Sequence, residues 1–230
     1  MSSSESRRNF LVAAASAGTA VLLHPAQALA DAPKAAAPAD VNATEDLMRE
    51  HGVLRRVLLV YSEAERRLLA GESPAQSIAA AAHIVERFIE GYHEKLEELF
   101  VFPKLTQAGK QVELVQVLTA QHHAGRKVTA EILAMSQPAS LASAAQRQAL
   151  AARLQLFSRM YQPHAAREDT DLFPAFHDLF TEKEFDALGD QFEEQEHKLL
   201  GSGGFEGAVK EVAQLESALG IHDLAQFTPR

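Results

Sequence analysis

The sequence predicts an all-α protein: an antiparallel four-helix bundle built from a duplicated helical hairpin, with further helices at the C-terminal end. Apolar residues recur at helical spacing along four stretches of roughly 25 to 30 residues, a length and pattern typical of bundle helices. No stretch shows the sustained period-two alternation of a strand, so a sheet is not expected. A set of chemically distinctive residues also recurs at one constant offset along the chain, which predicts an internal duplication.

Composition excludes several classes of function. The 230 residues are 47% hydrophobic and 23% charged, which is the balance of a globular protein. The formal net charge of -9 disfavours binding to nucleic acid, because a phosphate backbone would be repelled. The chain has no cysteine, so disulfides, thiolate catalysis and iron–sulfur clusters are excluded. Any metal site must therefore be built from histidine and carboxylate side chains.

The first 30 residues have the features of a signal peptide. Arg7 and Arg8 precede an apolar run over 10–23, and Ala28-Leu29-Ala30 offers the small residues that a signal peptidase accepts. The run is too short for a confident membrane span, so stable insertion is not expected. The arginine pair resembles twin-arginine signals, which implies export of a folded, cofactor-loaded protein by that machinery and a periplasmic or otherwise exported location. Residues 31–43, rich in proline and alanine, are expected to form a flexible linker.

The remaining elements follow in order. The bundle is expected over 44–180, with Thr44 as the N-cap of a helix that ends near Leu69. Ser73 and Pro74 open a second helix that ends near residue 105. The third and fourth helices are expected at about 110–135 and 144–176. Over 181–230 we expect a helical extension, in which Thr181 and Glu184 form a capping box and a last helix follows the glycines at 201–204.

Each predicted bundle helix carries a histidine in its apolar stripe. His51 lies in the stripe of the first helix and His122 in that of the third. The second and fourth helices each add a histidine followed four residues later by a glutamate, because His93 precedes Glu97 and His164 precedes Glu168. These six side chains are the candidate metal ligands: His51, His93, Glu97, His122, His164 and Glu168.

The same residues define the duplication. An offset of 71 residues relates the two single histidines, the two pairs of His-x-x-x-Glu residues and the two Phe-Pro pairs that follow them. The full set of related positions is His51/His122, Arg55/Arg126, Val57/Val128, His93/His164, Glu97/Glu168, Phe102/Phe173 and Pro103/Pro174. The chain therefore contains two copies of one helical hairpin, and each copy presents the same donors.

This arrangement suits a metal centre. A histidine and a glutamate four residues apart lie one above the other on a helix, so one ion can take a ligand from each. Carboxylates can also bridge two ions, and imidazole together with carboxylate suits iron, with manganese and zinc also compatible. Burying so many ionisable groups without a metal would cost several kcal/mol per charge.

These motifs resemble the hemerythrin-like, or His-His-Glu cation-binding, domain over about residues 45–176. The resemblance implies a four-helix bundle that holds two iron ions in a non-haem di-iron centre. It also implies that Glu97 and Glu168 are bridging carboxylates and that the four histidines are terminal ligands.

The sequence departs from the oxygen-carrying hemerythrins at one ligand position. Those proteins have a further histidine four residues after the third-helix ligand, where this chain has Arg126. Arginine cannot ligate a metal, so we expect it to pair with a carboxylate such as Glu94 or Asp169. Glu94 resembles an extra ligand of iron-sensing members, and Asp169 has the spacing of a bridging aspartate in the oxygen carriers. Both are weaker ligand candidates, and Glu168 is preferred because it obeys the 71-residue offset.

The other histidines of the bundle and extension have no partner motif. His123 points about 100° away from its neighbour on the helix, which makes it a weak ligand candidate. Surface positions are expected for His83, His177, His197 and His222. Tyr161 lies one turn before the fourth-helix ligand, where it is either a hydrogen-bond donor to the site or a packed core aromatic residue.

Three functions are compatible with such a site. The first is binding of a small ligand, such as oxygen or nitric oxide, for scavenging, detoxification or sensing. The second is an enzyme, namely a di-iron oxidase, a peroxidase or a nitric oxide reductase, and the third is a buffer for iron itself. Anionic ligands stabilise the ferric state, which weakens reversible carriage but does not choose between binding and turnover.

Export provides a test of the signal. Because a site assembled from four helices must be loaded before translocation, replacing both Arg7 and Arg8 with lysine should abolish accumulation outside the cytoplasm. Cell fractionation measures this, and undiminished export of the double variant would argue for the general secretory route.

Overall fold

The computed structural model describes residues 41–229, so the predicted signal peptide and most of the predicted linker lie outside the described residues. Within this range the protein is helical and contains no strand. The first helix is α1 (Ala43–Leu69). It begins two residues before the expected position, because the side-chain oxygen of Asn42, and not that of Thr44, accepts a hydrogen bond from the backbone N–H of Glu45 at 2.9 Å.

The second bundle helix is one continuous rod in which α-helical and π-helical segments alternate. It consists of α2 (Ala75–Ile84), η2 (Val85–His93), α3 (Glu94–Leu96), η3 (Glu97–Val101) and α4 (Phe102–Gln107). The third helix is α5 (Val112–Met135). A short 3-10 turn, η4 (Pro138–Leu141), leads to the fourth helix, which consists of α6 (Ala144–Arg167), η5 (Glu168–Leu172) and α7 (Phe173–His177).

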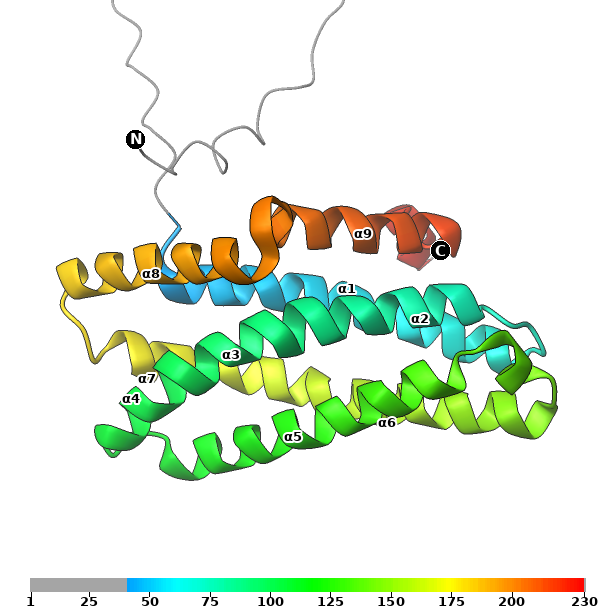
Figure 1. The fold of residues 1–230 in the computed structure, drawn as a ribbon, viewed down its shortest axis with the longest axis horizontal. Helices are drawn as coiled ribbons and strands as arrows, with labels where there is room; N and C mark the ends of the chain where they lie inside the picture. The colour runs from blue at the N-terminus through cyan, green and yellow to red at the C-terminus, as the bar shows by residue number, and fades with distance from the viewer. Residues whose placement is uncertain (1–40, 230) are drawn as a thin grey trace, which may run out of the picture. The chain divides into compact units, whose positions relative to one another are not determined.

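Successive rods run in opposite directions (Figure 1), and each rod packs against two neighbours, so that the four form a closed bundle. Helix α1 packs against α2 and most extensively against α6, while α5 packs against both α2 and α6. Their apolar stripes meet in the centre, where Leu47, Leu54, Tyr61, Leu154 and Phe157 are almost completely buried. The all-α bundle that the sequence predicts is therefore confirmed.

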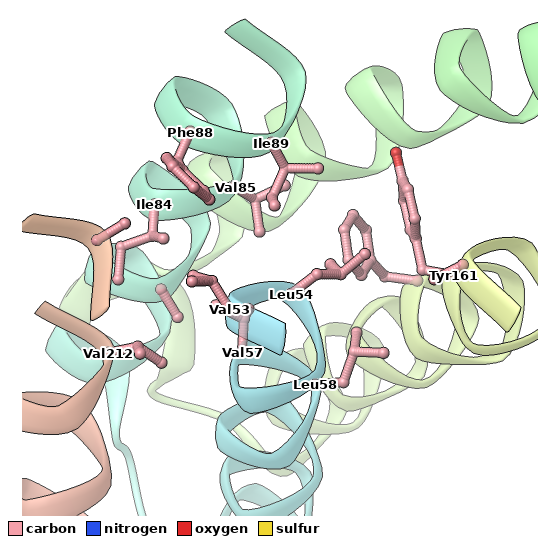
Figure 2. Packing of buried hydrophobic residues seen from close by; sticks show 14 of the residues in the cluster. Val53, Leu54, Val57, Leu58, Ile84, Val85, Phe88, Ile89, Tyr161 and Val212 are labelled. Carbon is pink, nitrogen blue, oxygen red and sulfur yellow. The ribbon is translucent and has the colours of Figure 1, made fainter. Parts of the chain in front are cut away.

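The extension forms two further helices on the outside of the bundle. They are α8 (Glu182–Leu200), capped by the predicted Thr181–Glu184 box, and α9 (Gly204–Ala218), with short 3-10 turns at η6 (Gly201–Gly203) and η7 (Leu224–Phe227). Both lie against α1 and the second helix, as Figure 1 shows. Figure 2 shows the apolar layer between α9 and the bundle. It contains Val53 and Val57 of α1, Ile84, Val85 and Phe88 of the second helix, and Val212 of α9.

Salt bridges also connect the extension to the bundle. Arg56 of α1 donates to Glu216 from Nε at 2.9 Å and from Nη2 at 2.5 Å, and Arg87 of η2 binds Glu211 at 2.8 Å. Exposed pairs of this kind contribute little individually, so the buried apolar layer carries most of the attachment. No helix among the described residues is long and apolar enough to span a bilayer.

The π-helical segments explain the Phe-Pro pairs. A proline inside an α-helix clashes with the carbonyl four residues earlier and lacks the N–H for its hydrogen bond. Here η3 and η5 end two residues before Pro103 and Pro174. The wider π turn changes the hydrogen-bond pattern of the helix at the point where proline provides no N–H. Both segments begin at the predicted bridging residues, Glu97 and Glu168. The sequence predicted regular helices here, so these π turns were not expected.

One close approach in the bundle gives a prediction about stability. A Cβ atom added at Gly125 would lie 2.1 Å from the Tyr161 hydroxyl, whereas one at Gly52 would meet nothing within 4 Å. Alanine at 125 should therefore lower the free energy of unfolding by about 1 kcal/mol or more, since overpacking outweighs the gain in helix propensity. Alanine at 52 should raise it by up to about 1 kcal/mol. Denaturant unfolding of both variants measures the difference, and equal effects would show that the Tyr161 ring moves freely.

Candidate metal centre

The six predicted ligands converge in the middle of the bundle. The exposed fraction is at most 3% for each of the six side chains. Their donor atoms form two groups, each with all four atoms within 4.8 Å of one another. One group contains His51, His93, Glu97 and Glu168, and the other contains Glu97, His122, His164 and Glu168. The two groups share both glutamates.

The duplication determines this sharing. Each group takes both of its histidines from one hairpin, while the two carboxylates come one from each hairpin. Glu97 lies 3.6 Å from Nε2 of His93 and 3.4 Å from Nε2 of His122. Glu168 lies 3.2 Å from Nε2 of His51 and 3.1 Å from Nε2 of His164. Each carboxylate therefore stands between histidines of both copies, which is the position of a bridging ligand.

The two carboxylates are not satisfied by the protein. All four of their oxygens are buried and have no partner in hydrogen-bonding geometry among residues 41–229. A buried carboxylate without such partners costs several kcal/mol, so orphaned groups of this kind need an explanation. Two shared carboxylates surrounded by imidazole nitrogens fit a pair of cations between them.

In each of the four candidate ligand histidines, Nδ1, the ring nitrogen that faces away from the shared glutamates, contacts an oxygen of another side chain. Nδ1 of His51 lies 2.6 Å from Asp169, and Nδ1 of His122 lies 3.2 Å from Glu98. Nδ1 of His93 lies 2.7 Å from Glu50. Such contacts fix the ring orientation and direct Nε2 at the metal, as in most histidine metal sites.

His164 completes this pattern with a neutral partner, since its Nδ1 lies 2.9 Å from Oε1 of Gln121. The partners of His93 and His164 were not predicted from the sequence, and neither was Glu98. The 71-residue offset could have found them, because it also relates Glu50 to Gln121 and Glu98 to Asp169.

Aromatic rings cover the two single histidines reciprocally. Phe102 of the first hairpin stacks on His122 of the second at 5.3 Å, and Phe173 of the second stacks on His51 of the first at 5.5 Å. The Phe-Pro pairs thus have two roles, because the proline is associated with the π turn and the phenylalanine packs over a predicted ligand.

The weaker candidates occupy the periphery of the site. Asp169 lies outside both four-residue groups and binds His51 together with Arg55. Glu94 belongs to a separate group with Glu98 and His122. Its Oε2 accepts from Arg126 at 2.6 Å, as expected, and its Oε1 accepts from the Tyr161 hydroxyl at 2.6 Å. Arg126 therefore pairs with Glu94 and Glu98, whereas Asp169 pairs with Arg55.

Carboxylates raise the pKa of the two single histidines, His51 and His122. Burial alone would lower the pKa of His51, but Asp169 and Glu168 raise this pKa to about 10. Burial likewise opposes the charge on His122, whose pKa Glu97 and Glu98 raise to about 10. Although burial disfavours the Glu168 carboxylate, His164 and His51 lower its pKa. The protein thus surrounds its histidines with negative charge, which suits binding of cations.

The remaining histidines among the described residues lie on the surface, as predicted for His83, His177, His197 and His222. His123 and His83 are exposed, and so are His177, His197 and His222. His83 contacts Glu86 of its own rod at 3.1 Å. Both side chains face solvent, in contrast to the buried residues of the two ligand groups.

The fold and site define a class: a four-helix bundle whose core carries two overlapping His-and-carboxylate groups for metal. The family model of the hemerythrin HHE cation binding domain matches residues 42–176. The chain belongs to this family and is a metal-binding protein.

Two relatives extend the comparison. Uncharacterized proteins of Mycobacterium tuberculosis and Mycobacterium bovis are each 48% identical to the chain over 190 residues, which are 82% of this chain and 74% of theirs. This aligned length exceeds the stretch that the family model matches, so the similarity is not confined to the domain. No solved structure matches the chain.

Replacement of the shared carboxylates tests the site. Glu97→Ala and Glu168→Ala should each lose bound metal and lower the melting temperature of the metal-loaded protein, because metal binding stabilises only the folded state. His83→Ala is the matched control on the same rod and should change neither. Metal content and thermal unfolding of the three variants measure this, and equal effects in all three would contradict the ligand assignment.

Proposed function

We propose that this chain is an exported non-haem di-iron protein that binds a small ligand, such as oxygen or nitric oxide, for scavenging, detoxification or sensing. One observation supports it above the others: Glu97 and Glu168, both with orphaned buried oxygens, are shared by two histidine pairs. The proposed ligands are the six residues of the two groups, and Glu94 and Asp169 act through their contacts with Arg126, Tyr161 and His51.

The donor set fits iron. Four imidazole nitrogens and two bridging carboxylates provide a mixed nitrogen and oxygen environment, which iron accepts readily. Bound iron would supply coordination positions for the small ligand and the electrons to reduce it. The chain's own contribution is to hold each imidazole by its Nδ1 atom, to keep the bridging carboxylates in place and to exclude water with Phe102 and Phe173.

Arg126 separates this site from that of an oxygen carrier. It lies where the carriers have a further histidine, and it pairs with Glu94 at 2.6 Å and Glu98 at 2.5 Å. The site therefore has one imidazole fewer than such a carrier, so carboxylates form a larger share of its ligands, which favours the ferric state. We infer scavenging, detoxification or sensing in preference to reversible carriage, and export through the twin-arginine machinery suits a role outside the cytoplasm.

A second candidate is a di-iron oxidase, peroxidase or nitric oxide reductase. Tyr161 favours it, because its hydroxyl donates to Glu94 at 2.6 Å and its ring contacts His164, with centroids 5.2 Å apart. Burial raises the pKa of Tyr161, so the phenol keeps its proton and can serve as a donor beside the site. Tyr161→Phe should slow turnover of peroxide or nitric oxide without loss of metal if the protein is an enzyme, and it should leave ligand affinity unchanged if the protein only binds.

Metal stoichiometry tests the proposal directly. Protein expressed with sufficient iron should contain close to two irons per chain, since two ligand groups share both carboxylates. Elemental analysis of the purified protein measures the content, and absorption spectra after reduction and exposure to air report ligand binding. One ion per chain, or zinc in preference to iron, would contradict the di-iron centre.

A further inference from the structure

The two metal positions are not equivalent, although the duplication relates them. His51 and His122 have matched surroundings, because each contacts a carboxylate that also binds an arginine: Asp169 with Arg55, and Glu98 with Arg126. His93 and His164 are also related by the offset, but their partners differ in charge. The residue facing His93 is Glu50, whereas the residue facing His164 is Gln121.

Glu50 is an unusual residue in the core. Its side chain is 0% exposed, and Oε2 lies 2.7 Å from Nδ1 of His93. Its other oxygen, Oε1, is buried and has no hydrogen-bond partner in the part of the chain that the structure describes. In contrast to Asp169 and Glu98, Glu50 forms no salt bridge with an arginine or lysine among the described residues, so its interaction with the site runs through His93.

The charges around the two positions therefore do not balance in the same way. Near the position of His51 and His93, Asp169 is compensated by Arg55 while Glu50 is not. Near the position of His122 and His164, two carboxylates face two cations, since Arg126 binds both Glu94 and Glu98 and Lys95 binds Glu98 at 2.6 Å. Of the offset-related pairs that contact the histidines, Glu50 and Gln121 differ in charge, so a carboxylate stands behind His93 where a neutral amide stands behind His164.

A carboxylate behind a ligating imidazole acts differently from an amide. It accepts the Nδ1 proton in a charge-assisted hydrogen bond, which makes the imidazole a better electron donor to the metal. An amide oxygen fixes the ring in the same orientation but lacks the charge. Partners of this kind change metal affinity by about 10-fold to 100-fold.

We propose that the position formed by His51 and His93 binds a divalent cation more tightly and fills first, and that the Glu50/Gln121 pair sets this order. Glu50 and Gln121 are positioning residues in this scheme, because each acts through the histidine it contacts. The inference rests on the proposed dinuclear site but goes beyond it, since a dinuclear site could equally well fill both positions together.

Stepwise binding of Fe²⁺ to the metal-free full chain tests the order. Anaerobic titration against a competing chelator should resolve two steps that differ by about tenfold or more in affinity. Glu50→Gln should weaken the tight step towards the affinity of the other. Gln121→Glu should tighten the weak step, and the double exchange E50Q/Q121E should restore two steps with the tight position transferred to His122 and His164.

Single-position variants identify which site is which. His122→Ala should keep the tight step and His51→Ala should lose it, whereas the order should reverse in the double-exchange background. Circular dichroism of each metal-free variant checks that the helices are intact, and Gln121→Glu remains informative if Glu50→Gln does not fold. Two equally tight steps, or a tight step that survives in His51→Ala, would overturn this inference and leave the dinuclear site standing. Binding of fewer than two ions would overturn both.

Discussion

Two glutamates in the centre of the bundle impose the constraint on which the rest of the site depends. Glu97 and Glu168 are completely buried, and their oxygens have no adequate hydrogen-bond partner among the described residues. Desolvation of a carboxylate is expensive, so the fold tolerates these groups only where positive charge compensates them. In the metal-free chain His51 and His122, whose pKa values are raised to about 10, contribute such charge, and in the proposed holoprotein it comes from two cations.

The duplicated hairpin supplies this compensation reciprocally. Each copy directs its Glu-bearing π turn at the other, so that Asp169 and Phe173 support the histidine of the first copy while Glu98 and Phe102 support that of the second. Neither hairpin contains a complete site by itself. Assembly of the two halves and formation of the site are thus the same event, which couples metal binding to folding.

Residues that differ between the two copies make the two metal positions different. Where both copies keep the same residue type, as at Arg55 and Arg126, the residue supports a structure common to both halves. Where they differ, as at Glu50 and Gln121, the two positions acquire different electrostatic surroundings. The extension adds a further asymmetry, because α8 and α9 pack mainly against α1 and the second helix.

The sequence by itself determined the helical class, the approximate helix bounds and the six clustered residues. Helical periodicity places His51 and Glu97 on buried faces without knowledge of the partner helices, and the 71-residue offset confirms the set independently of periodicity. Sequence reasoning also predicted that Arg126 pairs with Glu94 or Asp169, because an arginine is always protonated and cannot ligate a metal, and the structure pairs it with Glu94.

Only the tertiary structure decided how these residues divide between two groups and which side chains stand behind them. Whether Asp169 faces the shared centre or the back of an imidazole depends on the π turn that begins at Glu168, and π turns have no periodic signature. Glu50 and Gln121 are adjacent to a ligand in sequence, but their contacts are with histidines 43 residues away. Contacts between rods depend on packing and rotation of whole helices, and a single amphipathic pattern leaves both undetermined.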